Sequence, residues 1–186
     1  MRRAASTLAC AVALAVSGCD STGPSPTPYL SFTYSGVASG TFSVQGALTE
    51  QSTSGVTGGT DQGASVVMAV MADGATGILA FVLFPTASTG TLALQTEAQC
   101  DEGGPSMCVG VALMLTLGTG AEPTIALCTL TSGSVTVTKS TTEEAAGTFS
   151  GTGTCVDFAD TDLGTITLTD GAFLVRHSAD PPFTFG

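Results

Sequence analysis

The sequence predicts an all-β fold: a single antiparallel β-sandwich or barrel-like domain after a short N-terminal leader and tether. Thr, Val and Gly are abundant, and short apolar runs alternate with turn residues. No stretch after residue 18 combines a 3.6-residue apolar period with helix caps. Nine to ten strands can be placed at intervals of roughly 8–12 residues, which is typical of sandwiches and barrels.

The first two expected strands, 30–36 and 41–48, alternate apolar and polar residues, so each should bury one face. Their inward residues are Leu30, Phe32, Tyr34, Phe42, Val44 and Leu48. The polar, glycine-rich stretch 51–63 that follows is expected to be a long loop.

The next strands are nearly unbroken apolar runs at 64–72 and 77–84, and a third run covers 108–117. Asp73-Gly74 between the first two is a short-range hairpin signal. Runs without alternation predict central strands covered on both faces, or the walls of an apolar cavity. The remaining expected strands are 91–96, 124–130, 134–139, 147–158 and 164–175.

The first 18 residues have the three parts of a secretory signal peptide. Arg2 and Arg3 are followed by an apolar run over residues 8–16 and then by small residues. The run is too short to span a bilayer, which takes about 20 apolar residues. We therefore expect a leader at 1–18, a Pro/Ser/Thr-rich tether at 19–29 and a β-domain at 30–186.

Val16-Ser17-Gly18-Cys19 resembles the lipobox of bacterial lipoproteins. The resemblance implies that Cys19 carries a diacylglyceryl group, that the chain is cut before it, and that the protein is exported and lipid-anchored in the bacterial cell envelope. Two or more acyl chains hold a protein stably at a membrane. Asp20 resembles an inner-membrane retention signal of some lineages, but it leaves the choice of inner or outer membrane open.

Removal of the leader leaves 168 residues with two basic side chains, Lys139 and Arg176, against 15 acidic ones, a formal charge of −13. This balance excludes nucleic acid as a partner, because phosphate binding depends on Lys and Arg. Anionic headgroups should also repel the chain, so membrane contact is expected through the N-terminal lipid.

Four cysteines remain once Cys10 leaves with the leader and Cys19 is lipidated, which predicts two disulfides in an exported chain. Of the three connectivities, Cys100–Cys108 and Cys128–Cys155 are favoured. The first would close a compact loop. For the second, a hairpin that places Val135 opposite Phe149 leaves Cys128 and Cys155 one residue out of register, so one β-bulge aligns them. Reduced thiols are the alternative; a four-thiolate metal site lacks the usual C-x2-C pairs.

No catalytic constellation is found. His177 is the single histidine and is expected in a solvated loop or tail. The carboxylates Asp157, Asp160 and Asp162 are a candidate Ca²⁺ site, with a solvated turn as the alternative. No other metal or cofactor is indicated.

The last third contains a V-T-V-T strand, then G-T-F-S-G, then I-T-L-T-D-G-A-F. This pattern resembles the C-terminal half of uncharacterised bacterial lipoproteins. The resemblance implies a lipid-anchored β-domain and supplies no catalytic residues; Arg176-His177 stand where those relatives often have Pro.

Three functions are open. The first is a non-catalytic binding or structural module whose partner is a protein or a surface polymer. The second is a carrier of an apolar ligand in a β cavity, suggested by the apolar runs and by Met68, Met71 and Met114. The third is a hydrolase that uses carboxylates alone, for which the chain has no Trp to stack on sugar rings.

Overall fold

The computed structural model describes residues 26–73, 76–103, 107–118 and 123–178. Within these ranges the chain forms ten strands and one short helix. In chain order they are β1 (Tyr29–Gly36), β2 (Gly40–Gln45), β3 (Ser54–Asp61), β4 (Ala64–Asp73), β5 (Thr76–Pro85), β6 (Gly90–Ala93), α1 (Glu97–Gly103), β7 (Gly110–Leu117), β8 (Thr124–Ser140), β9 (Glu144–Val156) and β10 (Asp162–Arg176).

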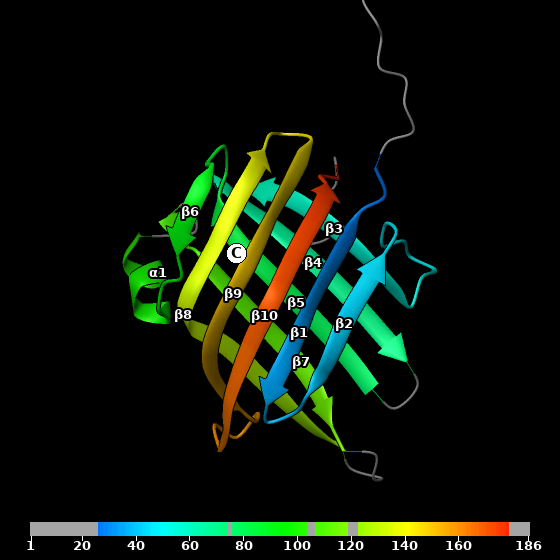
Figure 1. The fold of residues 1–186 in the computed structure, drawn as a ribbon, viewed down its shortest axis with the longest axis vertical. Coiled ribbons are helices and arrows are strands. Elements are labelled where there is room, and N and C mark those ends of the chain that lie inside the picture. The colour runs from blue at the N-terminus through cyan, green and yellow to red at the C-terminus, as the bar shows by residue number, and fades with distance from the viewer. Residues whose placement is uncertain (1–25, 74–75, 104–106, 119–122, 179–186) are drawn as a thin grey trace, which may run out of the picture.

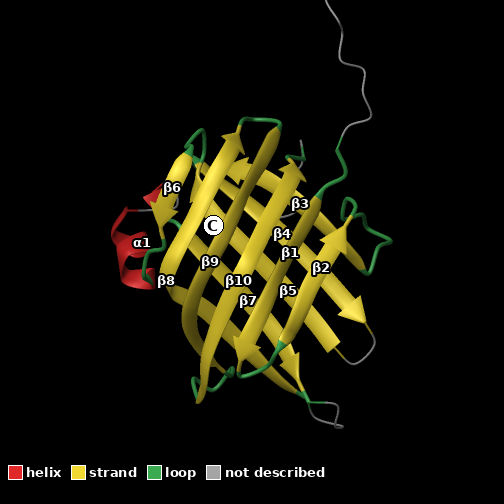
Figure 2. Cartoon of the chain, viewed as in Figure 1, coloured by secondary structure: helices red, strands yellow, loops and turns green. Residues whose placement is uncertain are grey.

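The strands form one antiparallel sheet in the order β2-β1-β10-β9-β8-β7-β5-β4-β3, and β6 pairs with the later part of β8. The sheet curls into a nearly closed, barrel-like body with two layers (Figure 1). We call β8, β9, β10, β1 and β2 the front layer and β3, β4, β5 and β7 the rear layer. Figure 2 shows α1 at one side, next to β6 and β8. The all-β antiparallel prediction is confirmed.

The gap between the two ends of the sheet is bridged by backbone hydrogen bonds to β3. The Leu48 amide donates to the Val56 carbonyl over 2.9 Å, and the Val56 amide donates to the Gly46 carbonyl over 2.9 Å. Farther along β3, the Ser178 amide donates to the Gly58 carbonyl over 2.8 Å. These bonds pair β3 in parallel with the segment after β2 and with the segment after β10.

Glycine on β3 makes this close approach feasible. A Cβ at Gly55 would lie 2.5 Å from the Leu48 Cα, and a Cβ at Gly58 would lie 2.7 Å from a Val175 methyl. Both distances are too short for real Cβ contacts. The glycines that made 51–63 look like a loop are therefore the residues that let a strand close the barrel.

The interior is filled by inward side chains of both layers, which form one contiguous apolar cluster. Phe32 and Phe42 stack with ring centroids 4.8 Å apart, and Phe84 and Phe173 lie 5.6 Å apart. The predicted inward residues of the first strand are placed correctly: Leu30 and Phe32 are fully buried, and Tyr34 is partly buried against the cluster.

Three expectations about secondary structure are wrong. Residues 51–63 are not one long loop, because they contain β3. The expected strands 124–130 and 134–139 are a single strand, β8, which continues through a register shift between Leu130 and Ser132. The Cys100–Cys108 segment contains the end of α1 and is not a plain loop.

The hairpin predicted at Asp73-Gly74 is confirmed, since β4 and β5 pair antiparallel as far as Asp73 and Thr76. The leader at 1–18, lipidated Cys19 and the tether up to residue 25 lie outside the described residues, so those expectations stay predictions. Among the described residues, no helix is both long and apolar enough to cross a membrane.

The closure predicts a sharp contrast between two glycines. Gly55→Ala should lower the free energy of unfolding by about 1–3 kcal/mol, because its Cβ would press on backbone atoms of Leu48. The matched control is Gly77→Ala on β5, whose Cβ would meet nothing closer than Thr116 Oγ1 at 3.4 Å. Urea unfolding followed by circular dichroism measures both. Equal stability of the two variants would contradict the closure geometry.

Candidate functional site

The rear layer presents an apolar surface to the outside as well as to the core. Along β5 and β7, buried and partly exposed residues alternate, so every second side chain points outward. We call the outward apolar side chains of β4, β5, β7 and the start of β8 the outer face. Its members are Met68, Val70, Leu79, Phe81, Leu83, Ala112, Met114, Ile125 and Leu127. Val66 points to the same side but is buried.

Strand register makes the outer face continuous. Met68 lies opposite Phe81, which lies opposite Ala112. One step along the strands, a second row runs from Leu79 through Met114 to Leu127. No Asp, Glu, Lys, Arg or His occurs in residues 64–72, 77–85, 110–117 or 124–131. The expectation that these runs are covered on both faces is therefore wrong: one face fills the core, and the other lies at the surface.

Two hollows indent the outer face. The larger, about 460 Å³, is lined by Val66, Phe81, Leu83 and Ala112 and by the nearby disulfide Cys100–Cys108. The smaller, about 140 Å³, lies farther along the strands, among Val70, Leu79, Met114 and Ile125. Both open to the outside, in contrast to an enclosed cavity.

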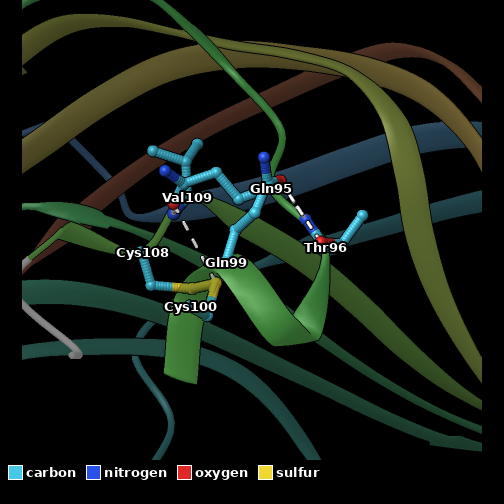
Figure 3. Close-up of a disulfide and its surroundings, with 6 residues drawn as sticks. All are labelled: Gln95, Thr96, Gln99, Cys100, Cys108 and Val109. Carbon is cyan, nitrogen blue, oxygen red and sulfur yellow. Dashed lines mark hydrogen bonds between the residues drawn. A yellow bond between two sulfur atoms is a disulfide. The ribbon is translucent and has the colours of Figure 1, made fainter. Parts of the chain in front are cut away.

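The disulfide loop beside the larger hollow is held to the barrel by Gln95 (Figure 3). The Gln95 amide donates to the Val109 carbonyl, and the Gln95 side-chain oxygen accepts from the Val109 amide, both over 2.9 Å. The Gln99 side chain accepts from the Thr96 amide over 2.9 Å at the start of α1. Cys100–Cys108 then ties α1 to the residues before β7. The predicted pairing is confirmed and gives the hollow a fixed wall.

The second predicted disulfide, Cys128–Cys155, is also formed. Val135 lies opposite Phe149 and Cys128 lies opposite Cys155, as the register argument required. The one-residue shift falls between Leu130 and Ser132 on β8. Thr131 is therefore the extra residue of the bulge.

The outside of the front layer is different in character, because threonine and serine dominate it. Thr148 and Thr136 lie opposite each other, and the Thr136 and Thr91 hydroxyl oxygens are 3.0 Å apart. The Ser132 and Thr152 hydroxyl oxygens are 2.7 Å apart. The two layers thus offer a polar and an apolar exterior.

His177 lies in a partly buried position at the closure, and not in the solvated tail that the sequence suggested. Its amide donates to the Glu143 carbonyl over 2.9 Å. Neither ring nitrogen has a hydrogen-bond partner within the described residues, although both are buried. Burial lowers the pKa of His177; the Thr142 backbone opposes this shift in part, without a well-formed hydrogen bond to the ring.

A polar hollow of about 420 Å³ adjoins His177 and includes Glu143, Glu144 and Arg176. Glu144 is already paired with Lys139 over 3.1 Å. No signal in the sequence indicates that His177 meets the β8–β9 turn, because the contact depends on how the barrel closes.

The three carboxylates of the Ca²⁺ candidate lie in or next to the turn between β9 and β10, and those of Asp157 and Asp162 accept hydrogen bonds from backbone amides there. Asp157 Oδ1 accepts from the Ala159 and Thr161 amides, each over 2.8 Å, and the Thr161 bond lowers the pKa of Asp157. Asp162 Oδ1 accepts from the Gly164 amide over 2.8 Å. Among the described residues, no three His, Cys, Asp or Glu side chains converge as a metal site would need.

Comparison with protein-family models, curated proteins and solved structures finds no match to this chain.

The buried imidazole predicts a pH dependence of stability. Because the folded-state pKa of His177 lies below the usual 6.5, the unfolded chain binds the proton more readily. The free energy of unfolding should therefore fall as the pH drops below about 6.5. His177→Gln should flatten this decline.

Thermal melts of both proteins between pH 7.5 and pH 5 measure the effect. The contribution of Asp157 does not interfere, because the stability that its lowered pKa provides is lost only below about pH 5. Parallel stability curves for the two proteins would show that His177 is not responsible.

Proposed function

We propose that the chain is an exported, lipid-anchored, non-catalytic β-domain that works by docking through its outer face. The observation that supports docking is the continuous, charge-free apolar surface of the rear layer. With about 3.3 Å per residue and about 4.8 Å between strands, it covers roughly 400 Å². Apolar patches of this size on soluble proteins are often functional.

Export and anchoring are supported by separate features. The leader has the order of a signal peptide and ends in Val16-Ser17-Gly18-Cys19. The four domain cysteines form two disulfides, as is usual in oxidising compartments outside the cytosol. His177 and the carboxylates of the β9–β10 turn have structural roles in this proposal, and no reaction step is assigned to them.

Cys19→Ala tests the anchor. The variant should keep its leader and lack lipid, because the thiol is the attachment atom. Whole-protein mass spectrometry and membrane fractionation measure cleavage and acylation. The matched control is Cys10→Ala, which alters the other leader cysteine and should be processed normally. Normal cleavage and acyl mass in the Cys19 variant would refute lipidation.

A second candidate is a carrier of a small apolar ligand, now placed in the larger hollow and not inside the barrel. The hollow of about 460 Å³ beside Cys100–Cys108 supports this candidate, because small-molecule sites are typically apolar hollows of about 300–1,000 Å³.

Native mass spectrometry of the protein isolated from its own host tests the carrier. A carrier should retain an extra apolar mass, and Ala112→Phe, which fills the hollow, should lose it. Thr148→Phe on the front layer is the control and should keep the mass. A bare polypeptide in the unmodified protein would rule against the carrier.

A further inference from the structure

The described chain begins beside the outer face. Pro26, Thr27 and Pro28 line a hollow on β3 together with Thr57. The Pro28 carbonyl accepts from the Gly46 amide over 2.9 Å, which fixes the segment there. Thr57 lies opposite Met68, and Met68 lies opposite Phe81. The centre of the outer face is therefore two strands, about 10 Å, from Thr57.

We infer that the outer face rests on the lipid bilayer that the Cys19 acyl chains enter, with a zwitterionic membrane surface as the occupant. This inference rests on the proposed function and names the docking partner. The domain would then touch the membrane twice, through its lipid and through the rear layer. The front layer, with its Ser and Thr side chains, would face away from the membrane.

The length of chain before the domain allows both contacts at once. Six residues lie between Cys19 and Pro26, so seven Cα–Cα steps span at most about 25 Å when extended. The outer face is about 20 Å across four strands. A lipid on Cys19 can therefore enter the bilayer next to the outer face while that face lies on the same membrane.

The distribution of charge selects the kind of membrane. The outer face carries no ionisable side chain, while Asp61 and Asp73 end β3 and β4, Asp157 follows β9, and the basic Arg176 lines the hollow with Thr57. Anionic headgroups would be repelled by the three aspartates, which we call the acidic rim, whereas zwitterionic headgroups meet no net repulsion. The net charge by itself predicts that the chain contacts a membrane only through its lipid. In the structure, however, the acidic residues are separate from the uncharged outer face.

The size of the outer face disfavours a second copy of the chain as its occupant. A standard protein–protein interface buries about 800 Å² on each partner. The outer face offers roughly half of that area, and the twist of the strands curves it away from a flat self-contact. A fluid bilayer can follow such a surface and fill its two hollows, which a rigid copy cannot do as readily.

Two exposed apolar side chains lie close along the chain to residues at the outer face. Met107 is 62% exposed and directly precedes Cys108, which lines the larger hollow. Phe158 is 69% exposed and follows Val156, the residue opposite Leu127. Along the chain, both adjoin the outer face at places where an apolar side chain would gain by entering lipid.

The experiment uses tryptophan as a position-specific reporter, because the chain has none. Full-length, lipidated Phe81→Trp protein is reconstituted into phosphatidylcholine vesicles with and without brominated acyl chains, which quench tryptophan on contact. We expect at least twofold quenching and a blue-shifted emission. The matched control is Thr148→Trp on the front layer, which should be neither quenched nor shifted. Met114→Trp serves as a second reporter if the first variant does not fold.

The outcomes separate this inference from the proposed function. Protein that floats with vesicles but shows no quenching at residue 81 or 114 keeps its anchor and overturns bilayer docking. Protein that does not float at all overturns the anchor itself. If the tryptophan at residue 81 is shielded from acrylamide but is not quenched by bromine, a protein covers the outer face. If this shielding depends on protein concentration, that protein is a second copy of the chain.

A change of lipid gives an independent check. Mixing phosphatidylglycerol into the vesicles should weaken the quenching of Phe81→Trp at low ionic strength, and added salt should restore it. Stronger quenching on anionic vesicles would overturn the assignment of a zwitterionic surface.

Discussion

The contact on which the rest of the structure depends is the approach of β3 to the ends of β2 and β10. A ten-stranded open sheet would leave two unpaired edges and two solvent-facing sides. Gly55 and Gly58 remove the side chains that would hold those edges apart, and three backbone hydrogen bonds span the gap. Once the sheet closes, the period of two along each strand separates an inside from an outside. The filled aromatic core and the partly buried His177 both follow from that closure.

Closure also divides the apolar runs of the rear layer into side chains that fill the core and side chains that point outward. A strand buried on one side needs only alternate apolar residues, as in the front layer, where Thr and Ser occupy the outward positions. β4, β5 and β7 are apolar at nearly every position. Their inward residues complete the core, so the outward ones are surplus to the stability of the domain. The outward positions of Phe81 and Met114, which the core does not need, support the proposal that this surface contacts an apolar partner.

Local patterns in the sequence were sufficient for most of the strands, for the β4–β5 hairpin and for both disulfides. The pairing of Val135 with Phe149 followed from alternation alone, and Cys128 and Cys155 then came into register through one bulge. Three features depend on residues far apart in the chain and could not be read in this way. β3 looked like a loop because its glycines serve a close approach to Leu48 and Val175. The outer face was hidden because an apolar run does not reveal whether its second side is covered, and the position of His177 depends on closure.

Net charge is a poor guide to what one surface of this domain can touch. Phe81 lies four and five residues from the ends of β5, roughly 15 Å from the acidic rim. The Debye length is about 8 Å at physiological ionic strength, so the field of the rim is largely screened at the centre of the outer face. The hydrophobic gain at the centre is not screened by salt, since it scales with the apolar area removed from water. Residues 19–186 carry a formal charge of −13, yet in our proposal the domain approaches lipid through its rear layer, and the acidic rim determines which headgroups it tolerates.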